Sequence, residues 1–256
     1  MLDDFSTYER LSIEPDGAVL RAWLDRPHNL NALDPQTLDE ITRLYTAVHQ
    51  FNEIRVVVLG GRGRAFSAGA DLKNHPSRPA PDGPPRKHRW VAQTGHRAIQ
   101  AILDCPAITV ARLHSHVIGG AVLLAAASDF RIGADDTVFR LPEVEIGLPL
   151  SWGGTPLLIN EIGAARAREM IVMCRPFPAD EAHRLGLLHS VVAVNDIDAE
   201  VTRWVERLLS LPHYPVEATK HQFQRYAAAQ RMADLSQTDA DIYQASLPRI
   251  QPGPQR

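Results

Sequence analysis

Hydrophobic and polar positions alternate near the start of the chain, in two short runs on either side of a turn. Residues 7–13 and 18–24 show the period of two that a half-buried strand produces. The segment between them, Glu14-Pro15-Asp16-Gly17, consists mostly of residues that favour turns. The pattern therefore predicts a β-hairpin.

A helix and a buried strand follow the hairpin. Asp34 and Pro35 are typical of an N-cap and a first helical position, and the helical pattern continues to about Phe51. The apolar run at residues 56–60 then indicates a strand that is buried on both faces. Because strands and helices continue to alternate along the chain, the sequence predicts an α/β fold.

Two regions depart from this alternation. Residues 74–89 contain five prolines and one glycine, which predicts a long loop that is either functional or an inert part of the surface. Past about residue 195 the strand-like runs stop, and residues 197–211, 216–230 and 233–245 look helical, with a tail at 248–256 that we expect to be disordered. We therefore divide the chain into an α/β core, 1–195, and a helical region, 196–256.

Bulk properties narrow the class of partner. The formal net charge is −3 and no basic cluster dominates, which argues against nucleic acid or an anionic membrane as the main partner. Cys105 and Cys174 lie in apolar surroundings and form no metal-binding motif, so we expect two buried thiols and no metal. The acidic N-terminus shows no signal peptide and no apolar run reaches transmembrane length, so we expect a cytoplasmic protein.

Two segments rich in small residues carry the candidate chemistry. They are Arg64–Leu72 and His116–Ala121, and each follows a β-branched run, at residues 55–59 and 107–111. Small residues let another group approach the backbone closely, and the second segment opens onto a helix-like stretch whose first N–H groups are unpaired. Two such N–H groups that converge on one point would stabilise an oxyanion.

The order and spacing of these and other motifs resemble the crotonase superfamily, also called the enoyl-CoA hydratase/isomerase family. The resemblance rests on the following segments: Arg26-Pro27, Asn31-Ala32-Leu33, Ser67–Leu72, Ile118-Gly119-Gly120, Ser128–Ile132, Phe139–Glu143, Gly153-Gly154-Thr155, Ala179–Ala182, Leu185–Leu187 and Ala218-Thr219-Lys220. It implies a spiral of ββα turns with a C-terminal helical region that assembles trimers or dimers of trimers. It also implies an acyl-CoA thioester substrate and no permanently bound cofactor, because the substrate itself carries coenzyme A.

The resemblance also assigns roles to individual residues. It implies that the backbone N–H groups of Ala68 and Gly120 form the oxyanion hole, and that Leu123, Ser151 and Trp152 line the acyl pocket. Coenzyme A contacts are implied at Arg26, Leu30, Ala32, Ala70, Asp71, Leu72 and Lys220. Arg26 and Lys220 would bind phosphate groups, Lys220 in its own or a neighbouring subunit, and Asp71 is expected to fix a turn rather than to take part in chemistry.

Glu143 is the best acid/base candidate, because a carboxylate beside an apolar pocket has a raised pKa. It matches one of the two glutamates of family hydratases, but Leu123 occupies the position of the other. Dienoyl-type isomerases carry an aspartate eight residues beyond the first acid, where this chain has Ser151. Glu145 is a weaker substitute acid, and His114 and His116 are left without a role.

A single base suffices to move a double bond, by removing a proton at C2 of a 3-enoyl thioester and returning one at C4. The sequence therefore favours a Δ3,Δ2-enoyl-CoA isomerase over an enoyl-CoA hydratase (a lyase) of fatty acid β-oxidation. An acyl-CoA hydrolase and a non-catalytic acyl-CoA binder stay open. Acyl chain length, pathway and the choice between trimer and hexamer cannot be read from the sequence.

Overall fold

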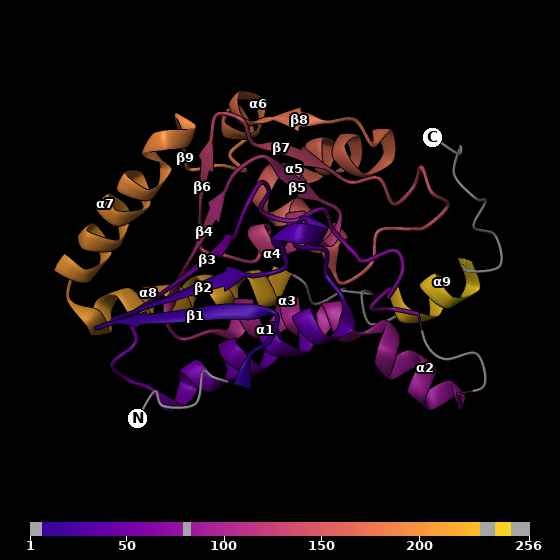
Figure 1. Cartoon of the computed structure of the whole chain (residues 1–256), viewed down its shortest axis with the longest axis horizontal. Coiled ribbons are helices and arrows are strands. Elements are labelled where there is room, and N and C mark those ends of the chain that lie inside the picture. The colour runs from indigo at the N-terminus through magenta and orange to yellow at the C-terminus, as the bar shows by residue number, and fades with distance from the viewer. Residues whose placement is uncertain (1–6, 79–82, 231–238, 247–256) are drawn as a thin grey trace.

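A six-stranded sheet forms the centre of the protein, and a smaller sheet lies beside it (Figure 1). The computed structural model describes residues 7–78, 83–230 and 239–246. The large sheet has the order β1 (Leu11–Asp16), β2 (Val19–Leu24), β3 (Val56–Gly61), β4 (Ile108–Leu113), β6 (Phe130–Ala134) and β9 (Ser190–Val192). The small sheet contains β5 (His116–Ile118), β7 (Val138–Arg140) and β8 (Phe177–Pro178).

The predicted hairpin is confirmed, with its turn shifted by about two residues. Strands β1 and β2 pair antiparallel from Leu11↔Leu24 to Asp16↔Val19, so the turn consists of Gly17 and Ala18. Gly17 has φ +58°, a left-handed conformation that glycine adopts without steric cost. Pro15 can lie within β1 because this is an edge strand, where a missing N–H leaves no neighbouring strand unpaired.

Helices surround the large sheet, and the N-terminal one begins where the sequence predicts. The carboxylate of Asp34 caps α1 by accepting hydrogen bonds from the N–H and hydroxyl groups of Thr37, at 2.8 and 2.7 Å. The α-helices are α1 (Pro35–Ala47), α2 (Pro85–Ala92), α3 (Thr94–Asp104), α4 (Gly120–Ala126), α5 (Gly154–Met173), α6 (Ala179–Arg184), α7 (Ile197–Ser210), α8 (His213–Gln230) and α9 (Asp239–Ser246). Single 3₁₀ turns occur at Pro27–Asn29, Val48–Gln50 and Val194–Asp196.

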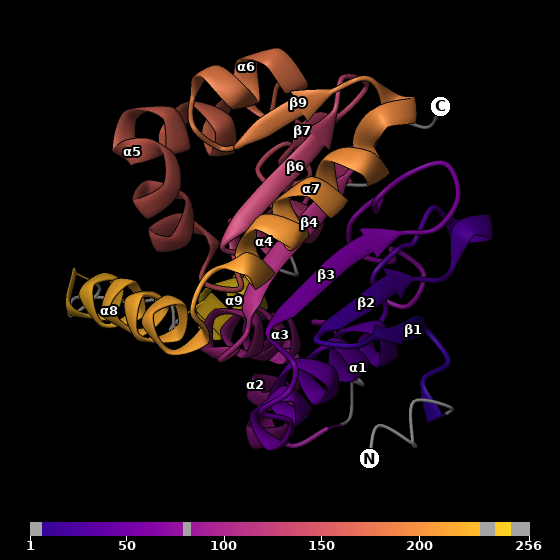
Figure 2. The same ribbon diagram turned by 90° about the vertical axis from the view of Figure 1, so that its left-hand side faces the viewer.

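Strand β3 separates two hydrophobic clusters, which explains its uninterrupted apolar sequence. Val57 and Leu59 point into the larger cluster, together with side chains of α1, α3 and α4. Val56 and Val58 point to the other face, where Ile197, Val201 and Val205 of α7 cover the sheet. Figure 2 shows α7 lying across this face of the strands.

Helix α2 corrects the prediction of a structureless loop at residues 74–89. The helix begins at Pro85, with Pro84 as its N-cap, and continues to Ala92. Prolines break a helix in its interior, but a proline at the first helical position loses no hydrogen bond. Residues 79–82 of this loop lie outside the described residues, as do the whole of the predicted tail, 248–256, and residues 233–238 of the last predicted helix.

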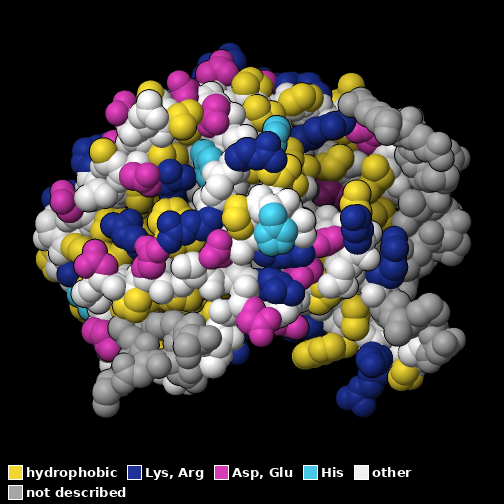
Figure 3. Space-filling model, in the orientation of Figure 1, with side chains coloured by type: hydrophobic (Ala, Val, Ile, Leu, Met, Phe, Trp, Pro, Cys, Tyr) yellow, Lys and Arg dark blue, Asp and Glu magenta, His cyan; other side chains and the backbone are white. Residues whose placement is uncertain are grey.

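The surface gives limited information about partners. Basic and acidic side chains lie intermixed over the face seen in Figure 3. In the described residues, no helix is both long enough and apolar enough to cross a membrane. Assembly into trimers and the division of the chain at residue 195 stay predictions. Helix α8 exposes Tyr214, Phe223 and Tyr226, as an interface between copies of the chain would require. The molar mass in solution would test the assembly into trimers.

Candidate active site

Backbone pairing brings four distant segments to one end of the small sheet. Strands β5 and β7 run parallel with Ile118 opposite Arg140, so Gly119 and Glu143 lie just beyond the ends of neighbouring strands. A bridge between Ser67 and Val117 adds the first small-residue segment on the other side of β5. A second bridge, between Leu33 and Ala70, adds the segment that follows Arg26. The predicted neighbourhood of the two small-residue segments is therefore present.

Gly119 makes room for the carboxylate of Glu143. A Cβ atom at position 119 would come within 2.8 Å of Oε1 of Glu143. The backbone there has φ +56° and ψ −127°, a combination that side chains other than hydrogen rarely permit. The N–H of Gly119 donates to the carbonyl of Arg140 at 2.8 Å, which ties the start of α4 to the strand that leads to Glu143.

The carboxyl group of Glu143 has little compensation for its charge, and its Oε2 atom is buried. Among the described residues, its Oε2 atom has no hydrogen-bond partner. Burial is the largest influence on its pKa and outweighs a weaker backbone hydrogen bond, so the pKa rises from 4.5 to about 7. A group with this pKa can both take up and release a proton near neutral pH.

A small cavity of about 40 Å³ opens beside Glu143. Its walls are largely apolar. They include Leu123, which is 1% exposed and occupies the position at which family hydratases carry a second glutamate. The lining residues are Ala70, His75, Gly120, Leu123, Glu143, Leu148, Pro149, Leu150, Ser151 and Trp152. Glu143 is the one carboxylate among them, and the three predicted acyl-pocket residues all belong to the set.

The structure corrects one of the two predicted backbone donors. The N–H of Ala68 donates to the carbonyl of Leu30 at 2.9 Å, and Ala68 does not line the cavity. Ala70 does line it. Leu33 bonds to the carbonyl of Gly69 and the N–H of Asp71, so the N–H of Ala70, between them, points away from Leu33. No backbone hydrogen bond from the N–H groups of Ala70 or Gly120 occurs in the described part of the chain.

Arg26 has partners within the protein, and its predicted contact with a coenzyme A phosphate stays a prediction. Its side chain is 13% exposed, and its guanidinium donates to the carbonyl of Ala32 at 2.6 Å and to the carboxylate of Asp71 at 3.1 Å. A further contact of 3.4 Å reaches Asp34. These partners engage both terminal nitrogens of the guanidinium. Arg26 joins the segment that contains Leu30 and Ala32 to the segment of Ala70, Asp71 and Leu72.

Asp71 fixes a turn, as the sequence analysis expected. Its Oδ1 atom accepts hydrogen bonds from the N–H groups of Lys73 and Asn74, at 3.0 and 3.2 Å. Burial alone would raise the pKa of Asp71, but these two N–H groups and Arg26 outweigh it and hold the pKa below its usual value. The neighbouring Leu72 is exposed.

Lys220 lies away from the cavity and is paired within its own chain, so its predicted contact with coenzyme A stays a prediction. Its side chain is 4% exposed, and its ammonium group donates to Asp129 at 2.6 Å and to the carbonyl of Ala107 at 2.7 Å. Asp129 follows the last turn of α4, whereas Gly120 is the first residue of that helix. The two sites are therefore separated by the length of α4, about 10 Å at 1.5 Å per residue.

The remaining acid and the two unassigned histidines stay outside the cavity lining. Glu145 is exposed and pairs with Arg140, because residues 143–147 form a turn in which alternate side chains do not share a face. His114 is buried between Arg112 and the carbonyl of Gly63, as a structural residue would be. His116 is exposed.

His75 is a cavity residue that the sequence analysis missed. Its Nδ1 accepts a hydrogen bond from the N–H of Ser77 at 3.2 Å, which places the ring proton on Nε2. Burial is the main reason that the pKa of His75 falls to about 4, so the ring is neutral at pH 7. The sequence does contain a signal for this role, because His75 lies just after the Ser67–Leu72 motif. The residue stands at the start of the predicted loop 74–89.

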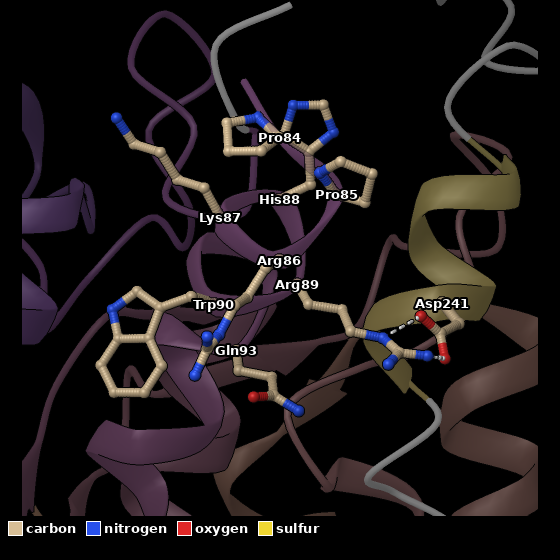
Figure 4. A pocket seen from close by; sticks show the side chains of 9 residues that line it. All are labelled: Pro84, Pro85, Arg86, Lys87, His88, Arg89, Trp90, Gln93 and Asp241. Carbon is tan, nitrogen blue, oxygen red and sulfur yellow. Dashed lines mark hydrogen bonds and ion pairs between the residues drawn. The ribbon is translucent and has the colours of Figure 1, made fainter.

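A much larger cavity, of about 890 Å³, lies on the surface beside α2 and α9. Figure 4 shows Arg89 reaching across to Asp241, while Lys87 points away from it. Asp241 is thus already paired, and the other described residues of the lining are cations, prolines, His88, Trp90 and Gln93, with no further carboxylate among them. The smaller cavity with Glu143 is therefore the better candidate for chemistry. In the part of the chain that the structure describes, no cluster of His, Cys, Asp or Glu could hold a metal ion.

Residues 14–252 match the family model described as enoyl-CoA hydratase/isomerase. The chain belongs to this family, the crotonase superfamily. It is 31% identical to the crotonyl-CoA hydratase of Syntrophomonas wolfei over 214 residues, which are 83% of this chain and 80% of that protein. It is 33% identical to a probable enoyl-CoA hydratase of Mycobacterium bovis over 194 residues, or 76% and 73% of the two chains.

Solved structures of crotonase-family proteins agree with the fold. An enoyl-CoA hydratase/isomerase from Xanthobacter autotrophicus superposes with a TM-score of 0.85 at 29% identity, covering 96% of this chain and 90% of that one. A putative enoyl-CoA hydratase from Thermobifida fusca, solved in complex with acetoacetyl-CoA, gives a TM-score of 0.77 at 29% identity over 94% of both chains. The fold predicted from the resemblance, a crotonase-type α/β architecture, is therefore confirmed.

Proposed function

We propose that this protein isomerises a 3-enoyl-CoA thioester to the 2-enoyl-CoA thioester, with Glu143 as the only base. The observation that carries the proposal is the cavity lining, in which Glu143 is the one carboxylate and Leu123 faces the same space. The acyl-CoA substrate is supported by family membership and by the acetoacetyl-CoA complex of the Thermobifida fusca relative.

In the proposed reaction, the thioester carbonyl oxygen accepts hydrogen bonds from the backbone N–H groups of Ala70 and Gly120. The carboxylate of Glu143 removes a proton from C2, and the resulting dienolate holds its negative charge on that oxygen. The protonated Glu143 then returns the proton to C4 as the double bond forms between C2 and C3. Preorganised donors of this kind contribute on the order of 10²–10³ in rate each.

The surroundings of Glu143 suit a proton shuttle. Since the pKa of Glu143 is about 7, the carboxylate and the acid forms are close in free energy at neutral pH. The apolar neighbours Leu123, Leu148 and Leu150 offer no competing acid or base. For the coenzyme, the adjoining backbone segments of Leu30–Ala32 and Ala70–Leu72, joined by Arg26, are the proposed contact region.

Hydration of a 2-enoyl-CoA is the second candidate, because several relatives are named enoyl-CoA hydratases. It requires a positioned water as well as proton delivery to C2. In the cavity lining, the hydroxyl of Ser151 and the imidazole of His75 are the side-chain groups besides Glu143 and Trp152 that could hold such a water. Glu145 is excluded from this role because it pairs with Arg140 on the surface.

Proton NMR in D₂O with 3-butenoyl-CoA and trans-3-hexenoyl-CoA distinguishes the candidates. Isomerisation gives the 2-enoyl ester, and we expect it with the wild type and with Glu145→Gln but not with Glu143→Gln. Glu145→Gln is the matched control, since it removes an exposed carboxylate two residues away. Crotonyl-CoA is tested in parallel, because hydration needs a 2-enoyl ester: a 3-hydroxyacyl-CoA formed from crotonyl-CoA, with the 3-enoyl esters unchanged, would instead support hydration. Saturable binding of the 3-enoyl esters and of crotonyl-CoA without any product would contradict both reactions and support a non-catalytic acyl-CoA binder.

A further inference from the structure

Trp152 lines the cavity beside Glu143, and its conformation is unusual. It is 5% exposed and has φ +60°, a left-handed conformation that a bulky residue rarely adopts. Bonds on either side hold the loop, because Gly154 N–H donates to Ser151 at 3.0 Å and Gly153 N–H donates to Asp239 at 2.9 Å. A strained position that its surroundings maintain in this way commonly marks a functional site.

Two glycines leave space for the indole ring. A Cβ atom at Gly95 of α3 would lie 2.0 Å from the ring, and a Cβ atom at Gly120 of α4 would also lie 2.0 Å from it. No side chain larger than hydrogen can therefore occupy either position while Trp152 keeps its place. The ring rests directly on the residue whose N–H we assign to the oxyanion hole, so it lies within a few atoms of the reacting carbonyl.

The indole is also fixed in orientation. Its Nε1–H donates to the hydroxyl of Ser77 at 3.0 Å, and Ser77 is itself buried. The N–H of Ser77 donates to His75, which lines the same cavity. A ring held by a hydrogen bond on one edge and packed closely against two glycines cannot swing aside easily to admit a longer ligand.

The space that remains is small. One water-sized group needs roughly 10–15 Å³ of such a volume, so the 40 Å³ of the cavity accommodates about three groups of that size. With the thioester carbonyl at Gly120, three further carbons fill the cavity up to the indole. Ligands that extend beyond this point would collide with Trp152.

We propose that Trp152 is the residue that determines acyl-chain length, and that it limits the pocket to acyl groups of about four carbons. The inference rests on the proposed acyl-CoA function, because it takes the cavity beside Glu143 as the acyl pocket. It names the substrate class more narrowly, as short-chain acyl-CoA thioesters.

Binding of saturated acyl-CoA esters tests this proposal without any turnover. Isothermal titration of acetyl-, butyryl-, hexanoyl- and octanoyl-CoA should give the tightest binding for butyryl-CoA, with at least a tenfold loss by octanoyl-CoA. Trp152→Ala should shift the optimum to hexanoyl- or octanoyl-CoA and raise the affinity for octanoyl-CoA about tenfold. Trp90→Ala, which removes an exposed tryptophan of α2, should leave the wild-type order unchanged.

Each result decides the proposal. Equal affinity of the wild type for butyryl- and octanoyl-CoA would overturn it, even if Trp152→Ala does not fold. Trp152→Phe, which keeps most of the packing, should give an intermediate order of affinities, and a wild-type order in a folded Trp152→Phe would count against the role of the indole. A length preference that follows residue 152 while no isomerisation is detected would leave this inference standing and remove the proposed reaction.

Discussion

Glu143 and Asp129 lie at opposite ends of α4 and differ in what surrounds their charges. One oxygen of Asp129 accepts three hydrogen bonds, from the N–H and hydroxyl of Thr109 and from the ammonium of Lys220, at 2.6–2.8 Å. The Oε2 atom of Glu143 has no such partner among the described residues, and burial raises the pKa of this carboxyl to about 7. Both carboxyl groups lie close to the same short helix, one near each end. Hydrogen bonds and an ion pair compensate the charge of Asp129, whereas the charge of Glu143 has no comparable compensation.

The difference separates a structural carboxylate from a chemical one. A folded protein gains nothing in stability from a buried acid without partners, because the desolvation cost is not offset. Such a group is therefore a strong candidate for function, especially beside a cavity. Asp129, by contrast, joins α8 to the start of β4 and to the end of α4, so its charge contributes to holding the helical region against the sheet.

Neutralising each carboxylate in turn tests the difference between Glu143 and Asp129 most strongly. We expect Glu143→Gln to lower the rate of 3-butenoyl-CoA isomerisation by about 10³ or more, since general acid–base catalysis contributes roughly 10²–10⁴. Asp129→Asn should change the rate of the folded protein by less than tenfold. Initial rates measured from the absorbance of the 2-enoyl thioester give both numbers. A folded Asp129→Asn that is as slow as Glu143→Gln would contradict the division of roles.

Removing the partner of Asp129 should mainly affect stability. Lys220→Met keeps the length of the side chain but leaves Asp129 without its cation, and breaking a buried ion pair in this way costs about 3–5 kcal/mol. Because Asp129 is 26% exposed, we expect the lower part of this range. Urea denaturation measures the free energy of unfolding, and Lys87→Met on the exposed surface of α2 serves as the matched control, with a change below about 0.5 kcal/mol. Unchanged stability together with weaker coenzyme A binding would support the phosphate role for Lys220.

Most elements of the fold follow from local signals in the sequence. The hairpin, the cap at Asp34 and the buried strand β3 each depend on residues within a few positions, and the structure contains all three. Helix α2 was missed because Pro84 and Pro85 were read as breakers, although a proline at a helix start is compatible with either interpretation. Local rules do not decide whether such prolines break a helix or begin one, since packing of α2 against α3 and α9 also stabilises this helix.

The site was predictable only in part, because its remaining details depend on distant partners. Glu143 and the two small-residue segments could be named from motif spacing. The choice between Ala68 and Ala70 as donor depends on which N–H the bridge to Leu33 turns toward the cavity, and no local pattern reports that. The internal partners of the two cations could not be predicted for the same reason: Arg26 meets Asp71, and Lys220 meets Asp129, across 45 and 91 positions of sequence.

The pH dependence of stability sharpens the comparison further, with a smaller effect. The folded pKa of Glu143, about 7, exceeds its value of 4.5 in an unfolded chain, and burial is the main cause. The group therefore costs no stability below about pH 4.5, where it is protonated in both states, and the stability of the fold decreases as the pH rises from there through about 7. The total change amounts to roughly 3 kcal/mol in the free energy of unfolding.

Glu143→Gln isolates this contribution, because the amide stays neutral at every pH. We expect the variant to match the wild type near pH 4.5 and to exceed its stability by about 3 kcal/mol at pH 8, measured by urea denaturation at both values. Glu145→Gln, which alters an exposed ion pair, should differ from the wild type by less than about 1 kcal/mol at both. Over the same interval the isomerisation rate of the wild type should rise, since only the carboxylate form of Glu143 removes a proton. If neither the stability nor the rate of the wild type changes between pH 4.5 and pH 8, Glu143 is not the uncompensated base that distinguishes this end of α4 from the end at Asp129.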